Sequence, residues 1–276
     1  MSSIKNVRLV CMDMDGTLFS VNEQIPDINI RALRECEKRG IRAALVSGRN
    51  YRFLTDHALK ISPNVSIVSA NGARIDERPG GKCIYEGVYE QDFAQTVSRI
   101  LWDSGVNYEA YTDSANFTFR PERVTPAHKR SLEKYQANGH LLKIENVSGW
   151  DTSGIKGIYK FVAFSDDVDL LDALRSAFDA KWIAHSSSSA QNVEIMPRGV
   201  NKGNALLILA DYLGIRQEDT MAFGDYTNDI DLLKASGYPV AMKNGVEQLK
   251  AVARYIAPDH LDGGIGRFLF EHVLIQ

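Results

Sequence analysis

The chain has 276 residues, of which 44% are hydrophobic and 24% charged, and these values are typical of a globular protein with one or two domains. A formal net charge of −3 leaves no basic stripe, which argues against nucleic acid as the main partner. The three cysteines form no CxxC pair, so we expect neither disulfides nor a zinc site. No apolar run approaches the ~18 residues of a membrane span, and the N-terminus lacks a signal-peptide pattern. We therefore expect a reduced, cytoplasmic protein without a membrane segment.

The first predicted element is the apolar run at residues 7–12, which indicates a buried parallel strand. It leads directly into the sequence Asp13-Met14-Asp15-Gly16-Thr17. Open α/β sheets bind ligands at the C-terminal ends of their strands, and two adjacent carboxylates repel unless a cation or a proton compensates them. The pair therefore indicates a catalytic site rather than a plain turn. An EF-hand calcium loop is excluded, because Leu18 and Gln24 stand where it needs Gly and Glu.

The next elements alternate between helix and strand, as in a parallel sheet with crossover helices. Two features at their ends stand out: the second strand ends at Ser47-Gly48-Arg49, and the third ends at Asn71-Gly72. The predicted elements are a helix at 28–38, a strand at 41–46, a helix at 51–60 and a strand at 65–69.

Near residue 83 the rhythm changes, and strands come in pairs between helices. This favours an α+β insert with a partly antiparallel sheet at residues 84–193. The turns Pro79–Lys82 and Arg198–Gly199 are predicted to be its paired hinges, and Ser186–Ser189 a polar loop. The predicted elements are helices at 92–103, 126–138 and 166–178, and strands at 107–111, 116–120, 157–164 and 192–195.

From Gly199 the alternation of strand and helix returns. Asn201 is a good N-cap for a helix that extends to residue 213, and a strand at 220–223 ends at Gly224-Asp225-Tyr226-Thr227-Asn228-Asp229. The remaining elements are a helix to residue 235, a strand at 240–242, a helix at 246–253 and a strand at 255–256. The fold class is therefore α/β, with a Rossmann-like, doubly wound parallel-sheet core at 1–83 and 194–276 and an inserted α+β domain between them.

Four motifs lie at strand ends or helix starts, and strand ends that are distant in sequence converge on one crevice in such a sheet. The candidate residues are Asp13, Asp15, Ser47, Gly48, Arg49, Lys202, Asp225, Asn228 and Asp229. Together they carry an excess of negative charge, which a divalent cation would balance. Because all the ligands are oxygens, Mg²⁺ fits best.

Each motif alone has a plainer interpretation. Ser-Gly-Arg is a common tripeptide, and Lys202 at a helix start would ordinarily be solvated, at the end of the helix dipole that disfavours a cation. Asn228 and Asp229 could simply cap their helix. A calcium loop that starts at Asp225 fails, because Ile230 stands where Gly is required. Only the order and context of the four motifs favour function.

The same motifs resemble those of the haloacid dehalogenase superfamily, and specifically its Cof-like phosphatases with a large α+β cap. The stretches that carry the resemblance are DMDGT at 13–17, SGR at 47–49, NGA at 71–73, EIMPRGVNKGNAL at 194–206 and GDYTND at 224–229. The resemblance implies a Mg²⁺-dependent phosphatase of small phosphorylated metabolites such as sugar phosphates. In this picture the cap chooses the substrate, and the protein is a monomer or a weak homodimer.

The resemblance also implies roles for the candidate residues. Asp13 would be the nucleophile that forms an aspartyl-phosphate, and Asp15 the general acid and base. Ser47, Gly48, Arg49 and Asn228 would bind the phosphate together with Lys202. Mg²⁺ would be held by Asp13, the Asp15 carbonyl, Asp225 and, through water or a second shell, Asp229. Two alternatives stay open, a phosphomutase with the same intermediate and a non-catalytic sensor of phosphorylated metabolites.

Overall fold

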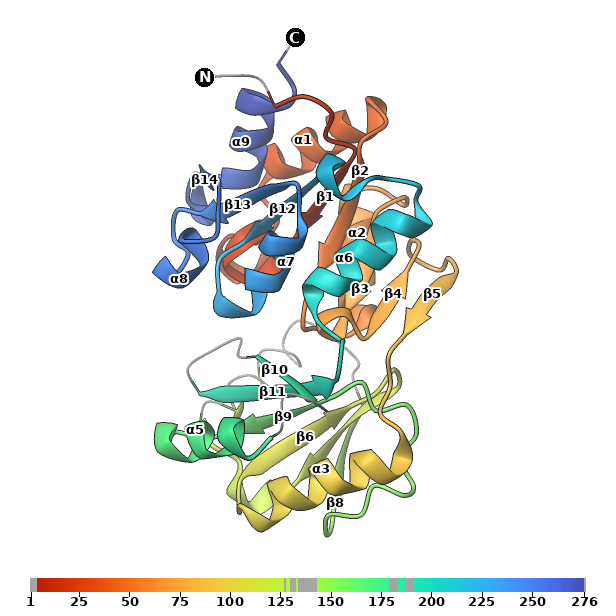
Figure 1. Cartoon of the computed structure of the whole chain (residues 1–276), viewed down its shortest axis with the longest axis vertical. Helices are drawn as coiled ribbons and strands as arrows, with labels where there is room; N and C mark the ends of the chain where they lie inside the picture. The colour runs from red at the N-terminus through yellow and green to blue at the C-terminus, as the bar shows by residue number, and fades with distance from the viewer. Residues whose placement is uncertain are drawn as a thin grey trace. The chain divides into compact units, whose positions relative to one another are not determined.

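The computed structural model describes residues 4–126, 128–129, 133, 143–178, 183–186 and 191–275. The chain divides into a core unit, Met1–Glu86 with Asn201–Gln276, and an inserted unit, Gly87–Val200. The core unit is therefore built from both ends of the chain, drawn in red to orange and in blue in Figure 1. The N–H of Ile4 donates to the carbonyl of His272 at 2.8 Å, which joins the two ends.

The core unit contains an eight-stranded sheet with the order β14-β13-β12-β1-β2-β3-β4-β5. Its strands are β1 Leu9–Met12, β2 Arg42–Val46, β3 Ser66–Ser69, β4 Arg74–Asp76, β5 Cys83–Glu86, β12 Thr220–Gly224, β13 Tyr238–Met242 and β14 Tyr255–Ala257. Its α-helices are α1 Asp27–Lys38, α2 Tyr51–Ile61, α6 Lys202–Tyr212, α7 Ile230–Ala235, α8 Glu247–Lys250 and α9 Gly264–His272. The strands from β14 to β3 are parallel, and β4 and β5 are added antiparallel.

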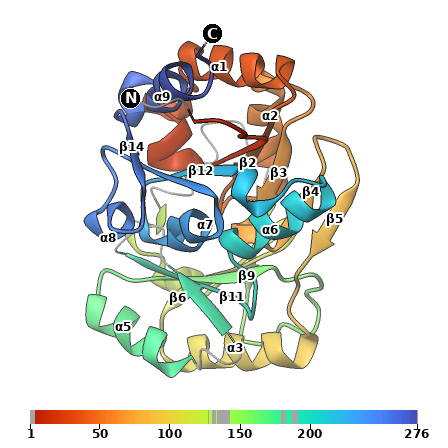
Figure 2. The same ribbon diagram turned by 45° about the horizontal axis from the view of Figure 1, so that its top comes forward.

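Helices cover both faces of this sheet, as expected for a doubly wound fold. In Figure 2, α1 and α9 lie on one side of the strands and α6, α7 and α8 on the other. Side chains of β1 alternate between the two faces. Leu9 and Cys11 pack in a cluster with Leu206 and Leu209 of α6. All four residues of β1 are buried completely, so this strand lies at the centre of the core.

The expected α/β class and doubly wound core are confirmed. One local prediction is wrong: Pro79–Lys82 is not at a crossing between units but turns β4 into β5, where the Glu77 N–H donates to the Lys82 carbonyl at 2.9 Å. The crossings fall at 86/87 and 200/201. The strands β4 and β5 were not predicted, because the turn that joins them was interpreted as a hinge. The helix α9 was not predicted, because it contains two glycines in its first three residues.

The inserted unit contains a six-stranded sheet with the order β10-β11-β9-β6-β7-β8, antiparallel except for the β7–β8 pair. Its strands are β6 Asn107–Tyr111, β7 Ala115–Phe119, β8 Lys143–Val147, β9 Lys160–Phe164, β10 Ile183–Ser186 and β11 Asn192–Pro197, and its described α-helices are α3 Gln91–Asp103 and α5 Val168–Ala177. One face packs Tyr108, Phe119 and Phe161 against these helices.

Two predicted segments of the inserted unit lie partly outside the described residues. The helix expected at 126–138 lies largely outside the described residues. Ser186 ends β10 rather than belonging to a loop, while 187–189 lie outside the described residues. The strand β11 extends past the expected boundary at 193/194 and pairs with β9 of the inserted unit. Among the described residues of either unit, none of the helices has the length and apolar character that a membrane span requires.

Candidate active site

The ends of three adjacent strands, β12, β1 and β2, carry most of the candidate residues. Asp13 follows β1, and its N–H donates to the Phe223 carbonyl of β12 at 3.0 Å. The chain then turns sharply at Met14–Leu18, where Gly16 has a φ of 73°. A Cβ on Gly16 would lie 2.7 Å from the Asp225 carboxyl carbon. Glycine is therefore required here both by the backbone conformation and by the close approach of the two loops.

A buried lysine joins two of the predicted carboxylates. The Lys202 Nζ lies 2.5 Å from Asp13 Oδ1 and 2.6 Å from Asp229 Oδ1, and the lysine and Asp229 side chains are 1% and 0% exposed. Lys202 is the first residue of α6, where the helix dipole disfavours a cation. Two charge-assisted hydrogen bonds outweigh that disadvantage.

Close packing between two helices brings the lysine to this place. Gly203 of α6 lies against Asp231 at the start of α7, where a Cβ would come within 2.7 Å of the Asp231 carbonyl carbon. Any larger residue would push the two helices apart. Because Lys202 precedes Gly203 and Asp229 precedes α7, this contact sets the spacing of the ion pair.

Asp225 and Asp229 are linked within one loop. Asp229 Oδ2 accepts hydrogen bonds from the N–H groups of Asp225 at 3.0 Å and Tyr226 at 3.3 Å. Asp225 Oδ1 accepts from the Thr17 hydroxyl at 2.9 Å, so the loop after β12 is tied to the turn after β1. Both oxygens of Asp229 are thus already engaged.

The residues fit a magnesium ion. One oxygen each of Asp13, Asp225 and Asp229 lies within 4.8 Å of the others. No hydrogen bond among the described residues engages Asp13 Oδ2 or Asp225 Oδ2, so these two oxygens remain for a cation. An all-oxygen set with one or two direct carboxylates is what Mg²⁺ prefers. Asp229, which is bound by Lys202 and two N–H groups, fits a supporting position behind the direct ligands.

The protonation of this cluster favours the same conclusion. Burial and then the charge of Asp229 raise the pKa of Asp13 well above its usual range, although Lys202 opposes this. Burial and then Asp229 raise the pKa of Asp225 to about 7. Burial would lower the pKa of Lys202, but Asp13 and Asp229 together hold it above its ordinary value. These raised pKa values mean that the clustered carboxylates favour a bound proton or a cation.

Asp15 and Arg49 form a second pair at the edge of this cluster. The Arg49 guanidinium contacts both oxygens of Asp15, at 2.7 and 2.5 Å, and also Glu23 at 2.9 Å. It lies over the Phe53 ring at 4.0 Å from the centroid. The Asp15 side chain is 54% exposed, unlike the buried Asp13, so the two carboxylates of the motif occupy different environments.

The other predicted phosphate ligands lie close in the chain to these groups. Ser47 is buried, and its hydroxyl accepts from the Arg49 N–H at 3.3 Å across Gly48. Asn228 is half-buried in the short helical turn Thr227–Asp229. The structure thus brings together Asp13, Lys202, Asp225 and Asp229 directly, and it joins Asp15 to Arg49 beside them.

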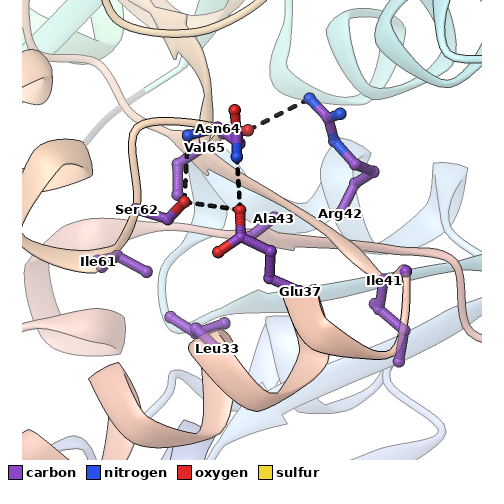
Figure 3. Close-up of a pocket in the computed structure, with 10 residues that line it drawn as sticks. Leu33, Glu37, Ile41, Arg42, Ala43, Ile61, Ser62, Asn64 and Val65 are labelled. Atoms are coloured by element: carbon purple, nitrogen blue, oxygen red, sulfur yellow. Dashed lines mark hydrogen bonds between the residues drawn. The ribbon is translucent and has the colours of Figure 1, made fainter.

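A cavity of about 250 Å³ lies elsewhere in the core unit (Figure 3). It lies at the N-terminal ends of β2 and β3, whereas Asp13 follows the C-terminal end of the parallel strand β1. Glu37 Oε1 accepts from Ser62 Oγ and from Asn64 Nδ2, each at 2.7 Å, and these bonds, Asn64 first, lower the pKa of Glu37. One carboxylate with both partners supplied by the chain offers no catalytic group, so this cavity is not the candidate active site.

Comparison with known proteins places the chain in a family. A family model for haloacid dehalogenase-like hydrolases matches residues 10–269. The chain belongs to this family. It is 30% identical to an HMP-PP phosphatase of Cronobacter sakazakii over 88% of this chain and 87% of that protein. It is 26% identical to a 5-amino-6-(5-phospho-D-ribitylamino)uracil phosphatase of Bacillus subtilis over 95% of this chain and 97% of that protein.

Solved structures of the family share the fold. A haloacid dehalogenase-like hydrolase of B. subtilis superposes with a TM-score of 0.84 at 24% identity and covers 96% of this chain and 99% of its own. The expected superfamily is confirmed. The expected enzyme class is confirmed as well, because the chain matches relatives named phosphatases over most of their length.

Sequence reasoning gave no role to several residues that shape the site. Thr17 binds Asp225, Gly203 spaces α6 from α7, and Glu23 binds Arg49. Asn244, in the loop after β13, donates to the Gly16 carbonyl at 2.8 Å. Thr17 and Gly203 lie inside the recognised motifs, whereas Glu23 and Asn244 lie outside them and carried no signal beyond their residue type.

Proposed function

We propose that this hydrolase is a Mg²⁺-dependent phosphatase that cleaves phosphate monoesters of small metabolites, such as sugar phosphates, through an aspartyl-phosphate. The observation that carries the proposal is the buried Asp13 carboxylate, bound by Lys202 at 2.5 Å within 4.8 Å of two further carboxylates. A buried carboxylate among other carboxylates is costly unless a cation compensates it. Sites of this kind are candidates for function.

In this proposal Asp13 attacks the phosphorus atom. The new bond joins an Asp13 oxygen to phosphorus, and the bond from phosphorus to the alcohol oxygen of the substrate breaks. Lys202 holds Asp13 Oδ1 and so fixes the orientation of the carboxylate. The same ammonium offsets negative charge on the phosphoryl oxygens. Bound Mg²⁺, held by Asp13, the Asp15 carbonyl and Asp225, would supply further charge neutralisation and help to orient the phosphate.

Asp15 is proposed to move the protons. It would give a proton to the departing alcohol and later accept one from the water that hydrolyses the aspartyl-phosphate. Its exposure suits contact with substrate and solvent.

Further residues are proposed to bind the phosphate. Ser47, Gly48 and Arg49 follow the strand next to β1, and Asn228 follows β12, the strand on its other side. We propose that the inserted unit selects the substrate and that the protein works in the cytoplasm as a monomer or weak homodimer. The curated relatives act on a phosphorylated ribitylaminouracil and on HMP-PP, and this supports a small phosphorylated substrate.

The test is a screen of phosphorylated metabolites for release of inorganic phosphate, with and without Mg²⁺. We expect turnover of at least one sugar or sugar-alcohol phosphate, its loss in EDTA, and its abolition in Asp13→Asn. Full activity of Asp13→Asn would refute the nucleophile. Formation of an isomer rather than free phosphate from a sugar bisphosphate would instead identify a phosphomutase.

A further inference from the structure

The loop that follows β13 contacts both segments that carry the proposed metal ligands. Asn244 Nδ2 donates to the Gly16 carbonyl at 2.8 Å, in the turn that contains Asp15. Two residues later, the Val246 N–H donates to the Asp225 carbonyl at 2.9 Å. No motif of the sequence includes this loop, yet it holds the two sides of the cation site at once.

The Asn244 amide has a defined orientation. Its Oδ1 accepts from the His260 N–H at 3.2 Å, while its Nδ2 donates to Gly16. A backbone N–H can only donate and a carbonyl can only accept, so the amide oxygen and nitrogen cannot exchange places. Asn244 is therefore a bridge between the turn after β1 and the loop that precedes α9, held at both ends.

The Gly16 peptide is a sensitive place for such a bridge. The peptide group that joins Asp15 to Gly16 contains the Asp15 carbonyl, which is proposed to bind Mg²⁺. Gly16 also has the left-handed φ of 73° and lies against the Asp225 carboxylate. A small rotation here would move the Asp15 carbonyl relative to Asp225. Because Mg²⁺ demands a nearly ideal octahedron at 2.0–2.1 Å, such a rotation would weaken binding.

We propose that Asn244 is a positioning residue that holds the Gly16 turn at the spacing from Asp225 that Mg²⁺ requires. This inference rests on the proposed function, since it assumes that the carboxylates bind Mg²⁺. Partners behind metal ligands typically contribute 10–100-fold to metal affinity. We therefore expect Asn244→Ala to bind Mg²⁺ about 10–100-fold more weakly than the unaltered protein.

The measurement is a titration of the metal-free protein with Mg²⁺ in the absence of substrate. Binding is detected by calorimetry and by the rise in thermal midpoint on adding Mg²⁺. In turnover, Asn244→Ala should need about 10–100-fold more Mg²⁺ for half-maximal rate, while kcat at saturating Mg²⁺ recovers to within a fewfold. A general loss of structure would not recover in this way. The matched control is Asn64→Ala, which removes a similar exposed asparagine hydrogen bond, to Glu37 at 2.7 Å (Figure 3). Asn64 precedes the N-terminal end of β3, away from the strand ends that Asp13 and Asp225 follow. The control should bind Mg²⁺ normally.

The outcomes separate the two proposals. An unaltered protein that does not bind Mg²⁺ would overturn the proposed function itself. Normal Mg²⁺ binding by both the unaltered protein and Asn244→Ala would overturn only the role of Asn244, as would a loss in Asn64→Ala of the same size. If the alanine variant does not fold, Asn244→Ser, whose short hydroxyl cannot reach Gly16, gives the same comparison.

Discussion

Replacing Lys202 by methionine should destabilise the core unit in a manner that depends on pH. The change removes the charge but keeps an unbranched side chain of similar length. It leaves Asp13 and Asp229 buried without the ammonium that now lies 2.5 and 2.6 Å from them. Removing one partner of a buried ion pair costs about 3–5 kcal/mol. At about 2–4 °C per kcal/mol for a unit of this size, the thermal midpoint should fall by about 6–20 °C.

The sign of the pH effect follows from the carboxylates. Lys202 is the group that lowers the pKa of Asp13, so its loss raises that pKa further above the ordinary unfolded value of about 3.9. A carboxyl whose pKa is raised by folding favours the folded state at low pH, and this contribution is lost as the pH rises through the folded pKa. The variant should therefore resemble the unaltered protein at pH 5 and be far less stable at pH 8.

Two probes distinguish the units in this experiment. All three tryptophans, Trp102, Trp150 and Trp182, lie in the inserted unit, so fluorescence follows that unit while circular dichroism follows both. The control is Lys160→Met, which breaks another buried pair, to Glu194 at 3.2 Å, inside the inserted unit. The control should lower the midpoint of thermal unfolding that fluorescence reports. It should leave unchanged the stabilisation of the core unit by added Mg²⁺. Equal losses for Lys202→Met at pH 5 and pH 8 in EDTA would refute charge compensation and indicate lost packing.

Four further outcomes are expected. Mg²⁺ affinity should fall as the pH drops below about 7, because Asp225 without metal has a pKa of about 7 and a protonated carboxyl is a poor ligand for a cation. Calorimetry between pH 5.5 and 8 measures this, and an affinity that does not change with pH would contradict it. Gly16→Ala should weaken Mg²⁺ binding severely, because its Cβ would meet the Asp225 carboxyl group, and normal affinity by the same method would count against that contact. Asp15→Asn should slow hydrolysis of a sugar phosphate by roughly 10²–10⁴-fold but spare release of nitrophenol in single turnovers, whereas equal losses would remove Asp15 from the acid role. Exchange of residues 87–200 for those of a relative should change substrate preference in a metabolite panel, and an unchanged preference would assign specificity to the core unit.

Much of the site could be predicted because strand ends converge in a parallel sheet. Asp13 and Asp225 follow adjacent strands, so their proximity follows from topology and motif alone. The pairing of Arg49 with Asp15 could not be foreseen, because it depends on the directions that two side chains from separate loops take. The same holds for Asn244, whose partner is a carbonyl 228 residues away in the chain. The strands β4 and β5 were missed because the glycine-containing turn that joins them was interpreted as a hinge between units.

The placement of β1 between β12 and β2 has a consequence for synthesis on the ribosome. Leu9–Met12 must wait for Thr220–Gly224, more than 200 residues later, before both of its edges are paired. The inserted unit is continuous and can fold as soon as it leaves the exit tunnel. We therefore expect the inserted unit to fold first during translation. Until then, the first 86 residues expose an apolar strand edge that would recruit chaperones.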